Sequence, residues 1–437
     1  MNNAPMPDKE TKKPQELSSP KGMRDIIGDD YYKFQGFFEK AQEVAVYYGF
    51  TPIETPILEY EETFTTAIGV GTDAIDKEMY SLKTKGGDQL AMRPEGTAGV
   101  MRAYLQNGMT NLPQPQMFYY YGPYFRHDKP QRGRYRQLYQ FGLESIGSEK
   151  SIMDALLIKT TVAILEEAGA KDLCVQINSM GDKEDRVSYI RELTNYYKKH
   201  LDDLSPLDRE RLKINPLRIL DSKEPATIAI NAGAPDIVSH LGTAAKKHFK
   251  EVLSALDEMH IAYEINKNLV RGLSYYTRTV FEISDPSPVE GEAPLSIAGG
   301  GRYDLLARQL GSKKDVPAMG VGIGVDRVIE SAWCKDLAPR IMKKPKVYFI
   351  QIGSEAKLKS INIVEILRKA HVPIMQSISK DSLGSQLAVA EKSGTPYVMI
   401  FGQMEAVHDT VIVRNMETRS QETVAISELS SYLKHLK

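Results

Sequence analysis

Two polar side chains on one face of a predicted strand could hold a small ligand between them. Residues 137–146, QLYQFGLESI, are rich in aromatic and other apolar residues and predict a strand. Strand alternation places Gln140, Gly142 and Glu144 on one face, with roughly 13 Å between the two polar side chains. A polar molecule could lie over the glycine and bind at both ends. The alternative is an amphipathic strand whose polar face is in water.

A basic loop precedes this strand. Residues 126–136 contain one acid, Asp128, and five cations: Arg126, Lys129, Arg132, Arg134 and Arg136. This concentration of positive charge suits phosphate groups, carried by a nucleotide, a nucleic acid or both. A solvated loop tip is the ordinary alternative, and the neighbouring ligand-sized gap favours the phosphate interpretation.

A third segment, residues 317–333, combines a bare strand face with a cation. In PAMGVGIGVDRVIESAW, the alternate residues Gly320, Gly322 and Gly324 leave one face without side chains, which suits a planar ring such as adenine. We expect Asp326 to cap the following helix. Arg327 in the first turn opposes the helix dipole, and a bound phosphate would explain it. An arginine that extends into water is the alternative.

The basic loop and the glycine-lined strand resemble two motifs of the class II aminoacyl-tRNA synthetases. YFRHDKPQRGRYRQLYQFGLE resembles motif 2 in the form found in histidyl-tRNA synthetases, and the segment 317–333 resembles motif 3. A predicted helix at 31–48, followed by the proline-marked segment 50–60, resembles motif 1, which forms the dimer interface of that class.

Three further segments resemble the histidyl-tRNA synthetases in particular. They are RPEGT at 93–97, NLVRGLSYYTRTVFEI at 268–283 and PLSIAGGGRYD at 294–304. The sequence departs from the family pattern at Ser274, where Asp is common, and at Leu305, where Gly is usual. The first departure bears on the affinity for histidine rather than on the identity of the substrate.

The resemblance implies a role for individual residues. The set implied for histidine is Glu95, Thr97, Gln140, Glu144, Arg271, Tyr275 and Tyr276. Within it, Glu95 and Thr97 would receive the α-ammonium, while Glu144 and Tyr276 would hold the imidazole. The set implied for ATP is Arg126, Arg134, Gly322, Gly324 and Arg327. The residues implied to be catalytic are Arg126, Arg271 and Arg327, which would neutralise charge on the phosphates together with Mg²⁺.

The fold that the resemblance implies is α+β. It is an antiparallel sheet flanked by helices in residues 21–335, with an inserted helical domain at about 182–261. A linker at 336–345 leads to a C-terminal α/β anticodon-binding domain at 346–437. Periodicity alone predicts only a mixed α/β protein, with C-terminal strands at 347–352, 373–378, 397–401 and 410–414.

Composition narrows the class of protein further. The formal net charge is −1, so RNA binding would depend on local patches, and the two cysteines are too far apart in sequence for a CxxC zinc motif. We expect a cytoplasmic protein with no DNA partner, no membrane partner and no structural metal. Residues 1–20 are polar and proline-rich, which predicts a disordered tail.

The resemblance therefore implies the activity of the histidyl-tRNA synthetase family, a homodimeric histidine–tRNA ligase that uses L-histidine, ATP and tRNA(His). The principal rival is a non-catalytic relative, such as the regulatory subunit of ATP phosphoribosyltransferase, which usually lacks motif residues and the C-terminal domain. A synthetase for proline, threonine or glycine is a second rival, and the segment 268–283 disfavours it. A simple RNA-binding module would need neither the glycine-lined strand nor the paired carboxylates.

Overall fold

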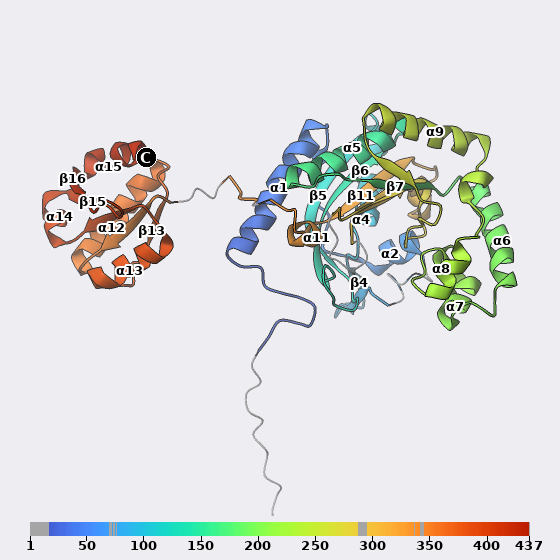
Figure 1. The fold of residues 1–437 in the computed structure, drawn as a ribbon, viewed down its shortest axis with the longest axis horizontal. Helices are drawn as coiled ribbons and strands as arrows, with labels where there is room; N and C mark the ends of the chain where they lie inside the picture. The colour runs from blue at the N-terminus through green and yellow to red at the C-terminus, as the bar shows by residue number, and fades with distance from the viewer. Residues whose placement is uncertain are drawn as a thin grey trace, which may run out of the picture. The chain divides into compact units, whose positions relative to one another are not determined.

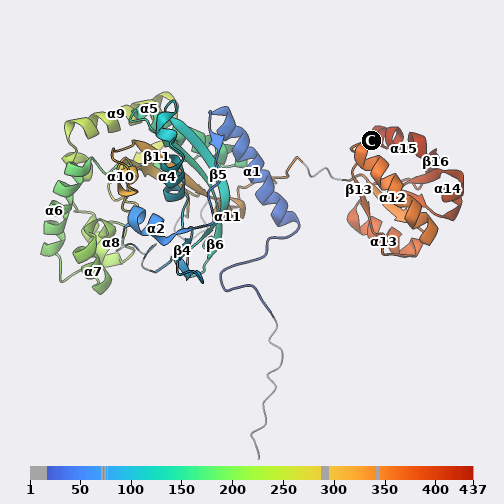
Figure 2. The same ribbon diagram turned by 180° about the vertical axis from the view of Figure 1, so that it is seen from behind.

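The fold is taken from a computed structural model. It describes residues 17–69, 72, 75, 77–286, 295–335, 337–340 and 345–436, which belong to two compact units divided between Pro339 and Arg340 (Figures 1 and 2). Most of the predicted N-terminal tail, and half of the predicted linker, lie outside the described residues. Residues 17–20 are exposed and form no helix or strand.

An eight-stranded sheet forms the centre of the first unit. Its strand order is β1-β5-β6-β11-β10-β9-β7-β8. The outermost pair at each edge is parallel, and the other neighbours are antiparallel, which confirms the predicted antiparallel sheet. The strands are β1 (Thr51–Pro52), β5 (Gln116–Phe125), β6 (Gln137–Ile146), β7 (Val175–Ser179), β8 (Tyr263–Ile265), β9 (Thr277–Ser284), β10 (Ser296–Arg302) and β11 (Ala318–Gly324).

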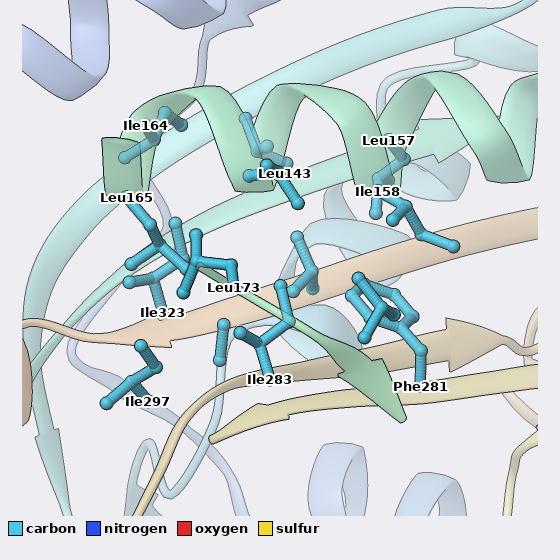
Figure 3. Close-up of a cluster of buried hydrophobic side chains, with 14 of the residues drawn as sticks. Leu143, Leu157, Ile158, Ile164, Leu165, Leu173, Phe281, Ile283, Ile297 and Ile323 are labelled. Carbon is cyan, nitrogen blue, oxygen red and sulfur yellow. The ribbon is translucent and has the colours of Figure 1, made fainter. Parts of the chain in front are cut away.

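Three long helices cover one face of this sheet. They are α1 (Asp29–Tyr47), α5 (Ser151–Ala168) and α9 (Thr243–Glu258). Their apolar side chains share one buried cluster with alternate residues of the strands, including Phe141, Leu143, Val321 and Ile323. Figure 3 shows the side chains of α5 meeting those of the central strands. Burial of this apolar surface fixes the register of β6 and β11, and so turns their other residues to the opposite face.

The opposite face supports smaller elements and the inserted helices. A three-stranded sheet (β2 Leu58–Tyr60, β3 Tyr80–Lys83, β4 Gln89–Met92) lies in sequence beside α2 (Glu61–Ile68), α4 (Thr97–Gln106) and η1 (Met109–Asn111). The inserted helices are α6 (Lys183–Lys199), α7 (Pro206–Ile214), η2 (Pro216–Ile219), α8 (Pro225–Asn231) and η3 (Ile237–His240). Side chains of α6, α7, η2 and η3 join α2 and α4 in a second buried cluster.

Several local features of this unit are set by short segments. Gly28 is the N-cap of α1. The segment 50–60 divides between two sheets, since β1 (Thr51–Pro52) joins the eight-stranded sheet and β2 (Leu58–Tyr60) joins the three-stranded one. The three glycines 299–301 lie within β10. The helix α10 (Leu306–Gln309) is a single turn.

The second unit is a five-stranded sheet with helices. Its strand order is β13-β12-β14-β15-β16, from β12 (Val347–Gln351), β13 (Ile374–Gln376), β14 (Tyr397–Phe401), β15 (Thr410–Asn415) and β16 (Gln421–Ala425). The helices are α12 (Ser354–Lys369), α13 (Leu383–Ser393), α14 (Gln403–His408) and α15 (Ile426–His435). The sequence did not predict β16, because only Val424 of its five residues is buried.

A buried ionic network joins α5, α9 and β10. Arg302 and Asp154 are both fully buried, and Arg302 Nη1 donates to Asp154 Oδ1 at 2.5 Å. The other oxygen of Asp154 contacts His248 Nε2 at 2.9 Å, and Arg302 Nε donates to Asp304 at 3.1 Å. The network holds the end of β10 against the helical layer.

We expect Asp154→Ala to destabilise the first unit by about 3–5 kcal/mol, because it leaves a buried guanidinium without its main partner. Chemical denaturation measures this loss. Asp315→Ala is the control, since its pair with Arg308 is exposed and should contribute little. Equal effects of the two substitutions would contradict the buried-pair argument.

Candidate active site

One pocket collects nearly all of the predicted site residues. It lies on the sheet face opposite the three long helices, above β6, β10 and β11. Eleven of the twelve predicted residues line it: Glu95, Thr97, Arg126, Arg134, Gln140, Arg271, Tyr275, Tyr276, Gly322, Gly324 and Arg327. The twelfth, Glu144, lies beneath the pocket floor. The structure therefore brings together residues that are more than 200 positions apart in the sequence.

Glu144 is fully buried and receives three hydroxyl groups. Thr97 Oγ1 and Tyr120 Oη donate to its Oε1 at 2.8 and 2.9 Å, and Tyr303 Oη donates to its Oε2. Burial raises the pKa of Glu144 to about 8, although the three donors act in the opposite direction. The carboxyl group is therefore held in a fixed orientation and takes up a proton readily.

Tyr120 corrects the sequence interpretation. It lies directly opposite Gly142 on β5, and a Cβ at position 142 would lie within about 2.0 Å of its ring. The space over Gly142 therefore holds the Tyr120 ring, and the predicted ligand gap there is wrong. Sequence reasoning missed Tyr120 and Tyr303 as site residues. The register opposite Gly142 would have identified Tyr120, and Tyr303 lies in the GGGRYD segment.

Glu95 is a buried residue at the start of α4 rather than part of an open loop. Its two carboxylate oxygens accept backbone N–H groups of Thr97 at 2.7 Å and Ala98 at 2.9 Å. Tyr275 Oη donates to the same carboxylate at 3.3 Å. Burial raises the pKa of Glu95, and the two backbone N–H groups oppose that rise. The helix N-terminus thus fixes an acidic group at the pocket wall.

Three cations meet at the other end of the pocket. Arg126 Nε donates to the Pro94 carbonyl at 2.8 Å, and Arg327 donates to the carbonyls of Gly133 and Ser296 at 2.9 and 2.5 Å. Arg134 contacts Asp128 at 3.3 Å. Burial lowers the pKa of Arg327, and the positive charges of Arg134 and Arg126 lower it further. A bound anion would relieve this repulsion.

Arg271 lies between the acidic and basic ends. Its Nη1 donates to Glu282 at 2.8 Å, and its guanidinium covers Gly299, where any Cβ would overlap it. The Nε of Arg271 is buried and has no hydrogen-bond partner among the described residues. A buried donor without a partner is costly, so this atom favours a ligand with an acceptor oxygen.

Asp326 does not cap its helix. The helix α11 (Val325–Glu330) has Gly324 as N-cap, and Asp326 lies inside its first turn. Its carboxylate accepts the backbone N–H of Tyr139 at 2.6 Å and the guanidinium of Arg24 at 2.8 Å. The acid is therefore a bridge between α11, β6 and the N-terminal segment. Arg327 occupies the predicted first turn.

The two departures from the family pattern have structural explanations. Ser274 Oγ donates to the Ile68 carbonyl, and the Ser274 carbonyl accepts from Arg186 at 2.8 Å. Leu305 has φ −96°, where a side chain causes no backbone strain.

Among the residues that the structure describes, no group of three or more His, Cys, Asp and Glu could hold a metal ion.

Residues 22–328 match the family described as Histidyl-tRNA synthetase, and residues 346–436 match the Anticodon binding domain. A histidine–tRNA ligase of Thermodesulfovibrio yellowstonii is 40% identical over 409 residues, which cover 94% of this chain and 96% of that protein. One from Fervidobacterium nodosum is 39% identical over 402 residues, 92% of this chain and 94% of that protein. The chain belongs to the histidyl-tRNA synthetase family. The predicted family is confirmed.

The fold of this family member also matches solved structures. Apo histidyl-tRNA synthetase of S. aureus has a TM-score of 0.78 at 28% identity, covering 96% of this chain and 100% of that one. A Bacillus halodurans C protein, described as an ATP phosphoribosyltransferase regulatory subunit/histidyl-tRNA synthetase, has a TM-score of 0.62 at 23% identity. That second likeness shows the fold alone.

The raised pKa of Glu144 predicts a pH-dependent stability. The unfolded chain loses this proton near pH 4.5, whereas the folded protein keeps it to about pH 8. The contribution of Glu144 to stability is therefore complete below pH 4.5 and falls as the pH rises towards 8. Glu144→Gln cannot ionise. Between pH 5 and pH 7.5, its free energy of unfolding should therefore rise by about 1–3 kcal/mol relative to that of the unsubstituted protein.

Denaturation of both proteins across this pH range provides the measurement. Other titrating groups contribute equally to both profiles and cancel in the difference. If the free energies of unfolding of the two proteins changed with pH by the same amount, the raised pKa of Glu144 would be contradicted.

Proposed function

We propose that this chain is a histidine–tRNA ligase, which activates L-histidine with ATP and transfers it to the 3′ end of tRNA(His). One observation carries the proposal: a single pocket has buried acids and tyrosines at one end and clustered arginines at the other. An enzyme that binds an amino acid next to a nucleoside triphosphate needs those two environments side by side. Membership of the family supports the assignment.

The acidic end suits histidine. Glu95 and Thr97 offer anionic and neutral acceptors for the α-ammonium, and Tyr276 offers a polar contact for the imidazole. Glu144 would contact the other imidazole nitrogen by giving up one of its three hydroxyl partners, since it does not line the pocket by itself. Gln140 and Tyr275 complete the proposed set of contacts. These protein groups are buried and oriented. An amino acid that lacks one of the two ring nitrogens would therefore leave one protein group without a hydrogen-bond partner.

The basic end suits ATP, which would bring Mg²⁺ as part of the substrate. Arg126, Arg134 and Arg327 would contact its phosphates, while Gly322 and Gly324 leave a flat floor for adenine. Arg271 would lie between the histidine carboxylate and the α-phosphate. The carboxylate is already nucleophilic, so the protein mainly positions the two reactants and neutralises charge that develops on phosphorus.

The second unit supports a tRNA substrate, because residues 346–436 match the Anticodon binding domain. The regulatory-subunit rival is disfavoured, since the chain keeps both this unit and the full set of pocket residues.

We further propose a cytoplasmic enzyme, because free Cys174 and Cys334 suit a reducing compartment. Within the described residues, no helix is both apolar enough and long enough to cross a membrane.

Amino-acid-dependent ATP–pyrophosphate exchange, run with each of the twenty amino acids, tests the proposal. We expect exchange with histidine alone. Arg271→Ala should lower the exchange rate by at least about 100-fold, because it removes charge stabilisation at the reacting phosphate. Arg308→Ala, at an exposed pair, is the control. Exchange with a different amino acid would contradict the roles of Glu144 and Tyr276, and no exchange would favour the regulatory rival.

Exposed apolar side chains support the proposed homodimer. Tyr47 is 87% exposed, and Val46, Ile57, Leu58 and Tyr60, which belong to the same segment resembling motif 1, are exposed too. An apolar group of this kind on the helix and strand of motif 1 is expected to be buried against a second copy.

We expect Tyr47→Asp to shift the protein from dimer to monomer, because the interface would then bury an unpaired charge. Sedimentation velocity measures the change. Ile214→Asp is a matched control, since Ile214 is exposed on an inserted helix. A protein that is monomeric without substitution would exclude the proposed dimer.

A further inference from the structure

A short N-terminal segment, Pro20–Arg24, lies against the basic loop. We call it the N-terminal strap. The backbone N–H of Arg136 donates to the Gly22 carbonyl at 2.8 Å, and Arg136 Nη1 also donates to the Lys21 carbonyl. Gly22 has φ +83°, and a Cβ there would come within 2.9 Å of the Arg136 side chain. The strap is therefore built for close contact with the end of the loop.

Arg24 at the end of the strap joins three elements of the site. Its guanidinium carbon lies 3.5 Å from the centroid of the Tyr135 ring. Its Nη2 donates to Asp326 at 2.8 Å and lies 3.6 Å from Glu330. Tyr135 Oη donates to Glu330 at 2.5 Å, so the stacked ring is itself tied to α11. One guanidinium thus connects the basic loop with motif 3.

These contacts reach the pocket directly. Tyr135 and Asp326 both line it, next to Arg134 and Arg327 respectively. At present the loop is also held by Arg327, which donates to the Gly133 carbonyl. If Arg327 turns to a phosphate, the loop loses that contact. The stacking of Arg24 on Tyr135 would then keep the loop in place.

We propose that Arg24 is a positioning residue of the ATP site, acting through Tyr135 and Asp326 on the basic loop and on α11. The inference rests on the proposed ligase function. Arg24 does not line the pocket, so its effect differs from that of a substrate contact. Among the residues that the structure describes, no hydrogen bond or ion pair joins the strap to Glu95 or Glu144. The affinity of the histidine end should therefore change little.

Kinetics of histidine-dependent ATP–pyrophosphate exchange test the inference. Arg24→Ala should raise KM for ATP about tenfold, because it removes a partly buried ion pair and a cation–π contact. KM for histidine should stay within about twofold. Arg24→Lys should be intermediate, since lysine keeps the charge opposite Asp326 but loses the planar stack on Tyr135. Arg308→Ala is the control and should change neither constant.

Amide hydrogen exchange of residues 126–136, measured without substrate, gives a second readout that does not depend on activity. Arg24→Ala should speed exchange in this loop and leave the inserted helices unchanged. Equal rises in both KM values, an unchanged KM for ATP, or unaltered exchange in the loop would overturn the inference. Absence of activity in the unsubstituted protein would instead contradict the proposed function, which keeps the two failures distinct.

Discussion

The site depends on a strip of sheet from which side chains are missing. Gly142, Gly322 and Gly299 are direct neighbours in register across β6, β11 and β10. A Cβ at Gly142 would overlap Tyr120, and a Cβ at Gly299 would overlap Arg271. Gly142 and Gly299 therefore make room for side chains that other parts of the chain supply, whereas a Cβ at Gly322 would meet only Gln140, at an ordinary contact distance of 3.7 Å. The same register turns the apolar residues between them towards α5, so core packing and site geometry share one cause.

Gly320 shows how closely this strip controls the chemistry. It is paired with Glu144 on β6, and its missing side chain leaves space for that carboxyl group, which would otherwise overlap a Cβ. Burial in this space raises the pKa of Glu144, while Thr97, Tyr120 and Tyr303 fix its orientation. The orientation of this carboxyl group is therefore set before any ligand binds.

Much of this site could be predicted from the sequence, because strand alternation and short motifs indicate which residues form it. Alternation in 137–146 and 317–333 gave the correct faces of β6 and β11, and the resemblance to known motifs located the cations. The roles of Tyr303 and Arg24 could not be predicted in this manner. Each depends on a pairing between distant segments, such as Arg24 with Asp326, about 300 positions apart. Strand β16 was missed for a local reason, since its mostly exposed residues show no apolar alternation.

The cations of the pocket are held by contacts that a substrate could replace. Arg126 and Arg327 donate to backbone carbonyls, and the buried Nε of Arg271 has no hydrogen-bond partner in the part of the chain that the structure describes. Charge-assisted bonds to phosphate are stronger than bonds to neutral carbonyls, so a triphosphate would compete successfully for these guanidinium groups. Arg327 would then release Gly133, whereas Arg24 would keep its contacts with Tyr135 and Asp326. Two arginines that hold the same loop would thus have separate tasks, one meeting the substrate and the other maintaining the loop.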